Sequence, residues 1–167
     1  MKRTVDVLVA LVISTGAWAA AGPVGGGILD AGLRGEYFAN VDLGGKPTFE
    51  RKDIRVRFDW CDLLPVIGSR AENLKDFPHD NFSVRWTGQV MARFDEPYTF
   101  KVLVAGGEAK LWVNGQLVTN QPVPLKANVP VDVKLEYRCK TRPAAVELRW
   151  SSPSTTEELV DVPPRTP

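Results

Sequence analysis

The chain has 167 residues, with 21 Lys and Arg against 20 Asp and Glu, so its formal net charge at pH 7 is +1. This length suits a single domain with one hydrophobic core. The charge balance lacks the basic excess that attracts nucleic acids or anionic lipid surfaces, so neither is expected as a partner.

The N-terminus has the pattern of a secretory signal peptide over residues 1–19. Lys2 and Arg3 precede an apolar run over residues 5–13, and Ala17-Trp18-Ala19 supplies a cleavage site with small residues. The run is far shorter than the ~20 residues of a membrane span. We therefore expect a secreted, periplasmic or cell-surface protein with no membrane span. The alternative is a buried N-terminal strand.

Residues 20–30 are expected to form a flexible lead-in, because residues 22–27 read Gly-Pro-Val-Gly-Gly-Gly. After them, alternation of apolar and polar residues predicts half-buried strands, and no segment shows a sustained apolar stripe at helical spacing. The expected strands span residues 54–60, 82–87, 98–104, 109–118, 129–137 and 145–150.

Two connections between these strands can be interpreted from their residues. Asn114-Gly115 lies between apolar alternations and predicts a type I′ hairpin turn. Residues 62–80 lack alternation, contain two prolines, and are longer than an ordinary loop, which indicates a surface excursion with one helical turn near residues 71–75.

Five segments in a fixed order carry a family resemblance. They are Gly32–Phe38 (GLRGEYF), Asp80–Gly88 (DNFSVRWTG), Tyr98–Phe100 (YTF), Leu111–Gly115 (LWVNG) and Val146–Pro153 (VELRWSSP). Together they resemble the protective-antigen N-terminal domain family, the PA-fourteen domain. The resemblance implies an all-β fold, an antiparallel β-sandwich or flattened barrel, over residues 31–163.

Cys61 and Cys139 are the two cysteines of the chain. In an exported protein an even pair is more often a disulfide than a metal or redox site, so we expect a Cys61–Cys139 disulfide. Such a bridge closes a long loop and contributes ~4 kcal/mol in the chain-entropy model. Two buried free thiols are the alternative.

Catalytic residue patterns are weak. His79 is the single histidine, it lies in a loop, and no nucleophile signature accompanies it, so we assign it no catalytic role. Asp59 and Asp62, or the adjacent Asp95 and Glu96, could in principle act as paired carboxylates, but solvated charges are the simpler interpretation. We expect no enzyme.

The resemblance also directs attention to a loop. In sugar-binding members of the family, two adjacent aspartates before the Leu-Trp-Val-Asp/Asn-Gly hairpin hold a calcium ion that coordinates sugar hydroxyls. Here the loop reads Ala105-Gly106-Gly107-Glu108, without either aspartate. Calcium needs six to eight oxygen ligands, so Glu108 alone predicts no tight metal site and no cofactor.

The remaining candidates for ligand contact are Gly106, Gly107, Glu108, Asn114 and Trp60. The glycines would let a ligand approach the backbone, and Trp60 is the aromatic ring most readily expected to be partly exposed, although packing against the disulfide is its simpler role. Trp86, Trp112 and Trp150 are interpreted as core residues, and Arg34, Arg55, Arg57, Arg85 and Arg149 as outward-facing solvated side chains.

Two functions are compatible with these features. The first is a non-catalytic module that binds extracellular or cell-surface carbohydrate, which rests on the family analogy. The alternative is a structural or protein-interaction module of the cell envelope or of a secreted assembly, with another secreted or envelope protein as its partner. The missing aspartate pair favours the alternative.

Overall fold

The computed structural model describes residues 32–61 and 77–162, with Cys61 described by its backbone only. Eleven strands and no helix lie in these two ranges. The strands are β1 (Leu33–Phe38), β2 (Phe49–Asp53), β3 (Arg57–Cys61), β4 (Phe82–Met91), β5 (Pro97–Ala105), β6 (Gly107–Val113), β7 (Gln116–Leu117), β8 (Val123–Pro124), β9 (Pro130–Cys139), β10 (Ala144–Ser152) and β11 (Thr155–Leu159).

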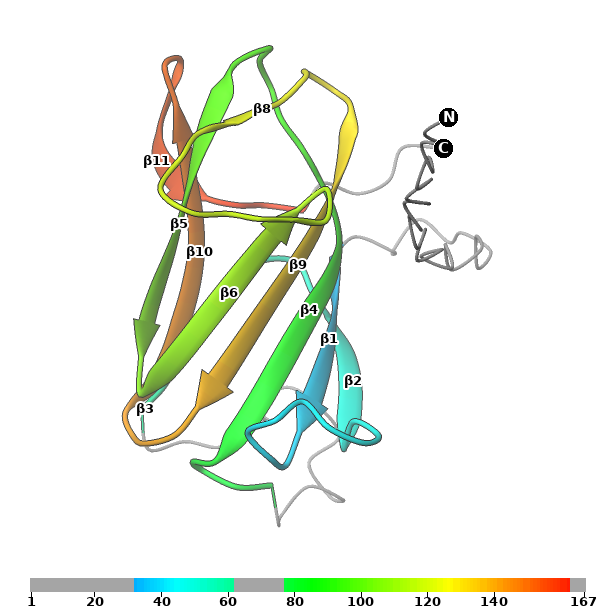
Figure 1. Ribbon diagram of the computed structural model, residues 1–167, viewed down its shortest axis with the longest axis vertical. Coiled ribbons are helices and arrows are strands. Elements are labelled where there is room, and N and C mark those ends of the chain that lie inside the picture. Colours follow the sequence, from blue (N-terminus) through cyan, green and yellow to red (C-terminus); the bar gives the residue numbers. More distant parts are fainter. Residues whose placement is uncertain (1–31, 62–76, 163–167) are drawn as a thin grey trace, which may run out of the picture.

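The strands form two sheets that face each other (Figure 1). One sheet has the order β2-β1-β4-β9-β6-β7, and the other has the order β11-β10-β5-β8 with β3 paired to β10 as its fifth strand. Every pairing between named strands is antiparallel, as hairpins and short connections require. The expected all-β antiparallel sandwich is confirmed.

The core lies between the two sheets and is rich in aromatic rings. Trp60 stacks on Phe58 with 5.1 Å between ring centroids, and Phe58 stacks on Trp86 at 5.6 Å. On the other sheet, β4 and β9 contribute Phe82 and Tyr137 to the same cluster. Alternation along the strands places these rings inward, and burial of such large apolar surfaces is the main stabilising contribution to a sandwich of this kind.

One buried carboxylate explains part of the N-terminal motif. Asp53 at the end of β2 accepts hydrogen bonds from the Tyr37 hydroxyl (2.8 Å) and the Trp86 indole nitrogen (2.7 Å), and it forms an ion pair with Arg51 (2.7 Å). A Cβ added at Gly35 would lie 2.7 Å from the Asp53 carboxylate. Gly35 is therefore required for this cluster to close, because a buried charge is tolerated only when it is fully paired.

Most expected strands are found, with shifted ends. Asn114 and Gly115 have φ of +49° and +76°, which confirms the type I′ turn between β6 and β7. The strand expected over residues 54–60 begins only at Arg57, with Ile54 exposed. The strands β1, β2, β8 and β11 lie outside the ranges expected from the alternation pattern.

The expected signal peptide at 1–19, the lead-in at 20–30 and the helical turn at 71–75 lie outside the described residues. Within the described residues, no helix has the length and hydropathy needed to cross a membrane.

The expected Cys61–Cys139 disulfide stays a prediction, because the Cys61 side chain lies outside the part of the chain that the structure describes. Cys139, the last residue of β9, is a buried free thiol whose Sγ lies 3.3 Å from the Thr141 carbonyl oxygen, to which it donates. The thiol is thus oriented toward the β9–β10 connection, where the Thr141 carbonyl is its hydrogen-bond partner. The expectation of a disulfide, which rested on export, did not consider this local partner.

Candidate functional site

The turn between β5 and β6 is closed by the chain itself. The Gly106 carbonyl accepts hydrogen bonds from the amides of Lys140 (2.8 Å) and Thr141 (2.9 Å). A Cβ at Gly106 would overlap the Thr141 carbonyl oxygen, and one at Gly107 would overlap the carbonyl oxygen of Arg138. The space beside Gly106 is therefore filled by the β9–β10 connection and the space beside Gly107 by the end of β9, so the expectation that a ligand uses this space is wrong for this face of the loop.

Glu108 and Asn114 lie at opposite ends of β6, about 20 Å apart at the usual rise per residue of a strand. Glu108 forms an ion pair with Lys140 at 3.5 Å, and both side chains are exposed. Asn114 forms the β6–β7 turn and accepts a hydrogen bond on its side-chain oxygen from the Asp132 amide (3.3 Å). The structure does not bring these two predicted residues into one site.

Trp60 is buried, with 4% of its surface exposed, and it packs against Phe58, Phe82 and Tyr137. The expectation of a partly exposed ring is wrong. The ring faces inward because it alternates with outward-facing Asp59 along β3.

Among the four tryptophans that the structure describes, Trp112 is the one that reaches the surface, contrary to its interpretation as a core residue. Its half-buried ring lies on the outer face of the six-stranded sheet, with the Lys134 ammonium 3.8 Å from the ring centroid. Leu111 and Val113 on either side are buried. Side chains alternate between the two faces of a strand, so inward-facing Leu111 and Val113 place Trp112 on the outer face. The sequence contained this signal.

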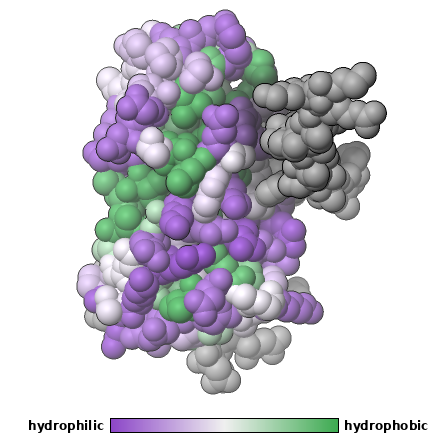
Figure 2. Space-filling view, in the orientation of Figure 1, coloured by the Kyte–Doolittle hydropathy of each residue, from purple (hydrophilic) through white to green (hydrophobic). Residues whose placement is uncertain are grey.

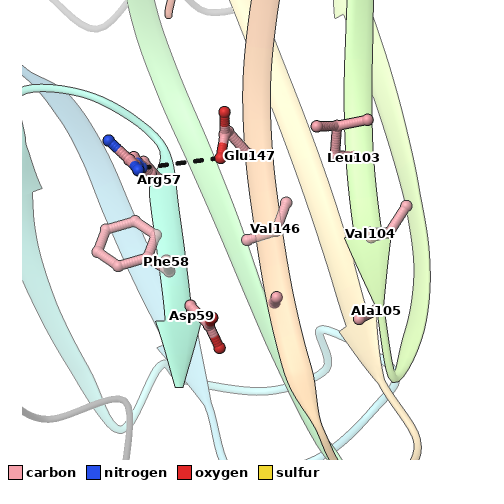
Figure 3. Close-up of a pocket in the computed structure, with 9 residues that line it drawn as sticks. Arg57, Phe58, Asp59, Leu103, Val104, Ala105, Val146 and Glu147 are labelled. Atoms are coloured by element: carbon pink, nitrogen blue, oxygen red, sulfur yellow. Dashed lines mark ion pairs between the residues drawn. The ribbon is translucent and has the colours of Figure 1, made fainter. Parts of the chain in front are cut away.

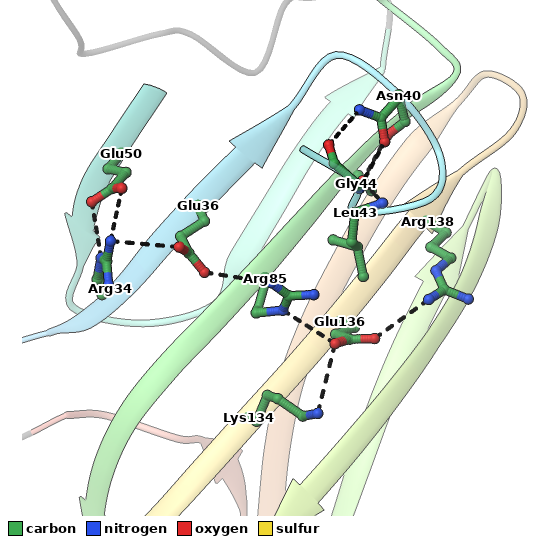
Figure 4. A network of polar contacts seen from close by, with 11 residues as sticks. Arg34, Glu36, Asn40, Leu43, Gly44, Glu50, Arg85, Lys134, Glu136 and Arg138 are labelled. Carbon is green, nitrogen blue, oxygen red and sulfur yellow. Dashed lines mark hydrogen bonds and ion pairs between the residues drawn. The ribbon is translucent and has the colours of Figure 1, made fainter. Parts of the chain in front are cut away.

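The rest of that outer face is an interlocked set of charges (Figure 4). Glu136 on β9 pairs with Arg85 (3.2 Å), Arg138 (3.5 Å) and Lys134 (3.7 Å). At the β1–β2 edge, Arg34 forms two hydrogen bonds to the Glu50 carboxylate, at 2.8 and 2.9 Å, which lower the pKa of Glu50. Since these cations lie next to carboxylates, this part of the face presents no uniform field to a charged polymer.

The outer face of the five-stranded sheet carries a hollow with a volume of about 280 Å³ (Figure 3). Its residues come from three adjacent strands. They are Arg57, Phe58 and Asp59 on β3, Ala145, Val146 and Glu147 on β10, and Leu103, Val104 and Ala105 on β5.

Strand register explains the shape of the hollow. Ala145 pairs with Asp59 on one side and with Ala105 on the other, so two methyl groups occupy positions between longer side chains. In the next row, Glu147 lies between Arg57 and Leu103. Small residues in the middle of a sheet face leave a depression that the longer neighbours flank.

The lining is polar on one side and apolar on the other. The Glu147 carboxylate is paired with Arg57 at 3.8 Å and with Arg149, so cations from two directions fix its position. Asp59 adds a second carboxylate to the same side, and Leu103 supplies an apolar surface across β10. Planar carboxylate and guanidinium groups bind pairs of hydroxyl groups, and the apolar wall suits the C–H face of a ring.

The described residues contain no cluster of three or more His, Cys, Asp or Glu side chains that could hold a metal ion.

Comparison with known proteins places the chain in a family. The PA14 domain family model matches residues 29–162. The chain is 34% identical over 141 residues to the anti-sigma-I factor RsgI3 of Acetivibrio thermocellus, a match that covers 78% of this chain and 20% of that protein. The chain thus spans about a fifth of the length of the curated relative it matches.

Solved structures agree with this assignment. An anti-sigma factor domain-containing protein from Clostridium clariflavum superposes with a TM-score of 0.67 at 32% identity, over 81% of this chain and 48% of that one. A PA14 sugar-binding domain from an RTX adhesin superposes with a TM-score of 0.54 at 18% identity, over 80% of this chain and 99% of that one, which shows a common fold. The chain belongs to the PA14 domain family.

Proposed function

We propose that this chain is a non-catalytic recognition module that binds extracellular carbohydrate in the hollow between β3, β10 and β5. The observation that carries the proposal is the mixed lining of the hollow, where Arg57, Asp59 and Glu147 face the apolar Leu103. Sugar rings present hydroxyl groups along their edges and C–H groups on their faces, so they need both kinds of surface at once.

Three further features support this proposal. The volume of about 280 Å³ lies near the lower end of small-molecule sites and suits one or two sugar rings. The polar groups stand on paired strands and are oriented before the ligand arrives. Two relatives at 32–34% identity are an anti-sigma-I factor and an anti-sigma factor domain-containing protein, which supports a sensing module as the broader role of this domain.

Export is part of the same proposal. It rests on the signal-peptide pattern of residues 1–19, and it would give the hollow access to polysaccharides of the cell surface or the surroundings.

The test is a glycan-array screen of the purified protein, followed by calorimetric titration of the strongest ligand with and without a chelator. Arg57→Ala and Glu147→Gln should each weaken binding at least tenfold, because each removes a charged group from the hollow. The matched control is Arg93→Ala, since Arg93 also pairs with a single carboxylate, at 3.5 Å, and is 65% exposed against 62% for Arg57.

Three results would contradict the proposal. Equal affinities of the Arg57 and Arg93 variants for the glycan would show that the hollow is not the binding site. The absence of any glycan ligand would favour the structural or protein-interaction alternative. Hydrolysis of the bound glycan would show that the module is an enzyme.

A further inference from the structure

One edge of the five-stranded sheet is open. On one side, β5 pairs with β10 from Thr99 to Ala105. On its other side, β8 pairs only with Pro97 and Tyr98. Beyond Tyr98, no strand among the described residues covers this edge of β5.

The unpaired backbone groups can be assigned from the neighbouring hydrogen bonds. The Leu148 amide donates to the Val56 carbonyl (3.0 Å), and the Leu148 carbonyl accepts from the Val160 amide (3.1 Å), so both groups point away from β5. Val102 lies opposite Leu148 in the ladder and must therefore turn its own N–H and C=O away from β10. By the same alternation, Val104 also directs its N–H and C=O to the open edge, where no described residue bonds them.

The side chains at this edge are apolar and exposed. Alternation from Tyr98 and Phe100 places Val102 and Val104 toward the interior, yet burial decreases along the strand and Val104 is 42% exposed. Leu103 on the outer face is 41% exposed. Figure 2 shows a continuous apolar area along the side of the molecule where β5 and β6 run.

Charges are absent from the stretch between Val102 and Ala105. Natural sheets usually protect an open edge with a lysine, a proline or a bulge. The nearest candidate, Lys101, is bound to Glu157 of β11 at 3.1 Å, on the outer face. The edge is thus accessible to another strand and suited to apolar side chains.

We propose that a second copy of this chain occupies the edge, with the two β5 strands paired antiparallel about a two-fold axis at Leu103. In this register Val102 of one copy faces Val104 of the other, and each such pair exchanges two hydrogen bonds. Leu103 faces Leu103, and Lys101 faces Ala105.

The register satisfies the requirements of an isologous contact. The backbone groups left open on one copy are the partners that the other copy needs, as a two-fold axis demands. No like charges meet, and a formal net charge of +1 gives little repulsion between copies. Because only a few residues of each strand pair, the contact is smaller than a standard interface, and we expect a weak dimer with Kd of about 10–100 µM.

Sedimentation of the purified protein across a range of concentrations tests this dimer. The wild type should shift from monomer to dimer as its concentration rises through the Kd. Leu103→Lys should raise Kd at least tenfold, because it places two ammonium groups opposite each other at the axis. The control is Leu117→Lys, since Leu117 is an exposed leucine (53%) on β7 in the other sheet, and it should leave Kd unchanged.

A cross-linking variant tests the register itself. In Leu103→Cys the two new thiols should form an intermolecular disulfide under mild oxidation, because directly opposed residues of an antiparallel pair lie within disulfide reach. The wild type measures cross-linking through the native cysteines, and Leu117→Cys measures cross-linking by random collision.

Three results would each overturn the proposal. The protein could stay monomeric up to about ten times the expected Kd. The two lysine variants could have equal effects on Kd, or cross-linking could be equal at positions 103 and 117. If the protein is a monomer, the strand that pairs with this edge would belong to a different protein.

Discussion

Gly107 is the residue at which the packing of the chain on itself is most restrictive. A side chain there would overlap the Arg138 carbonyl oxygen on the neighbouring strand β9. The backbone of a central ladder has little freedom to move aside, because each shift disturbs hydrogen bonds on both sides.

Gly107→Ala should therefore lower the free energy of unfolding by about 3 kcal/mol, within the range of severe overpacking. Urea unfolding followed by tryptophan fluorescence measures the change. Gly44→Ala is the control, since a Cβ at Gly44 meets no atom within 4 Å, and it should change stability by less than about 0.5 kcal/mol. Similar losses in both variants would contradict the packing argument.

Cys139 leads to a second prediction at this scale. Burial raises the pKa of its thiol, so the reactive thiolate is scarce near neutral pH. Alkylation in the native state should leave Cys139 unmodified for hours, whereas alkylation in urea should modify it within minutes. Peptide mass spectrometry after each treatment gives the answer. A Cys139 peptide linked to Cys61 would instead restore the disulfide expected from export.

Single residues also show where sequence interpretation succeeds. Trp86 and Trp150 were correctly expected in the core, and the Asn114-Gly115 turn was correctly typed, because each depends on a local pattern. Gly106 and Gly107 were misinterpreted because their neighbour is a segment more than thirty positions away. A glycine pair permits close approach of a backbone, but the sequence does not state whether that backbone belongs to a ligand or to the same chain.

At the scale of elements, β2 was missed for an identifiable reason. Its sequence, Phe49-Glu50-Arg51-Lys52-Asp53, holds a single apolar residue, so alternation of hydropathy cannot reveal it. The inward position of Asp53 is stabilised by hydrogen bonds from Tyr37 and Trp86. A strand whose buried end is a paired carboxylate has no hydrophobic signature.

The connections near β5 depend on carboxylates and give a prediction about pH. The Ala127 amide donates to Asp95 at 2.7 Å and lowers the pKa of that carboxyl, with Lys126 adding to the effect. The hydroxyl and the amide of Ser154 both donate hydrogen bonds to the Glu96 carboxylate and lower the pKa of that carboxyl. A carboxyl with a depressed folded-state pKa contributes stability that is complete above its unfolded-state pKa and is lost as the pH falls through the folded-state value.

The melting temperature of the wild type should accordingly fall as the pH drops below about 4, the region of unfolded carboxyl pKa values. Asp95→Asn should have a lower melting temperature than the wild type at pH 7 and a weaker dependence on acid. Asp42→Asn, in the exposed β1–β2 connection, is the control and should follow the wild-type profile. Parallel acid profiles for the wild type and Asp95→Asn would show that this loop contact does not contribute.

For the whole molecule, the architecture was more predictable than the site. The sandwich follows from alternating strands between turn residues and from the five family segments, all of which are local in sequence. The site depends on which strands become neighbours. Arg57 and Asp59 lie near Glu147 and Leu103 only because β3 and β5 flank β10. No sequence pattern within any of these three strands predicts that pairing. Likewise, β6 separates Glu108 from Asn114, which family analogy had grouped together.

The row Arg57–Glu147–Leu103 runs across the sheet at right angles to its strands and reaches the open edge at Leu103. In the proposed dimer this row continues into its symmetry mate, so that the two β10 strands are separated by three strand spacings, about 14 Å. Both hollows would then open on the same side, within reach of one polysaccharide chain. After one hollow is occupied, the second would meet its segment of that chain at an effective concentration in the millimolar range, and avidity of this kind commonly exceeds single-site affinity by ~10²-fold or more. The pair would thereby retain long polymers and release short oligosaccharides, which a single hollow cannot distinguish.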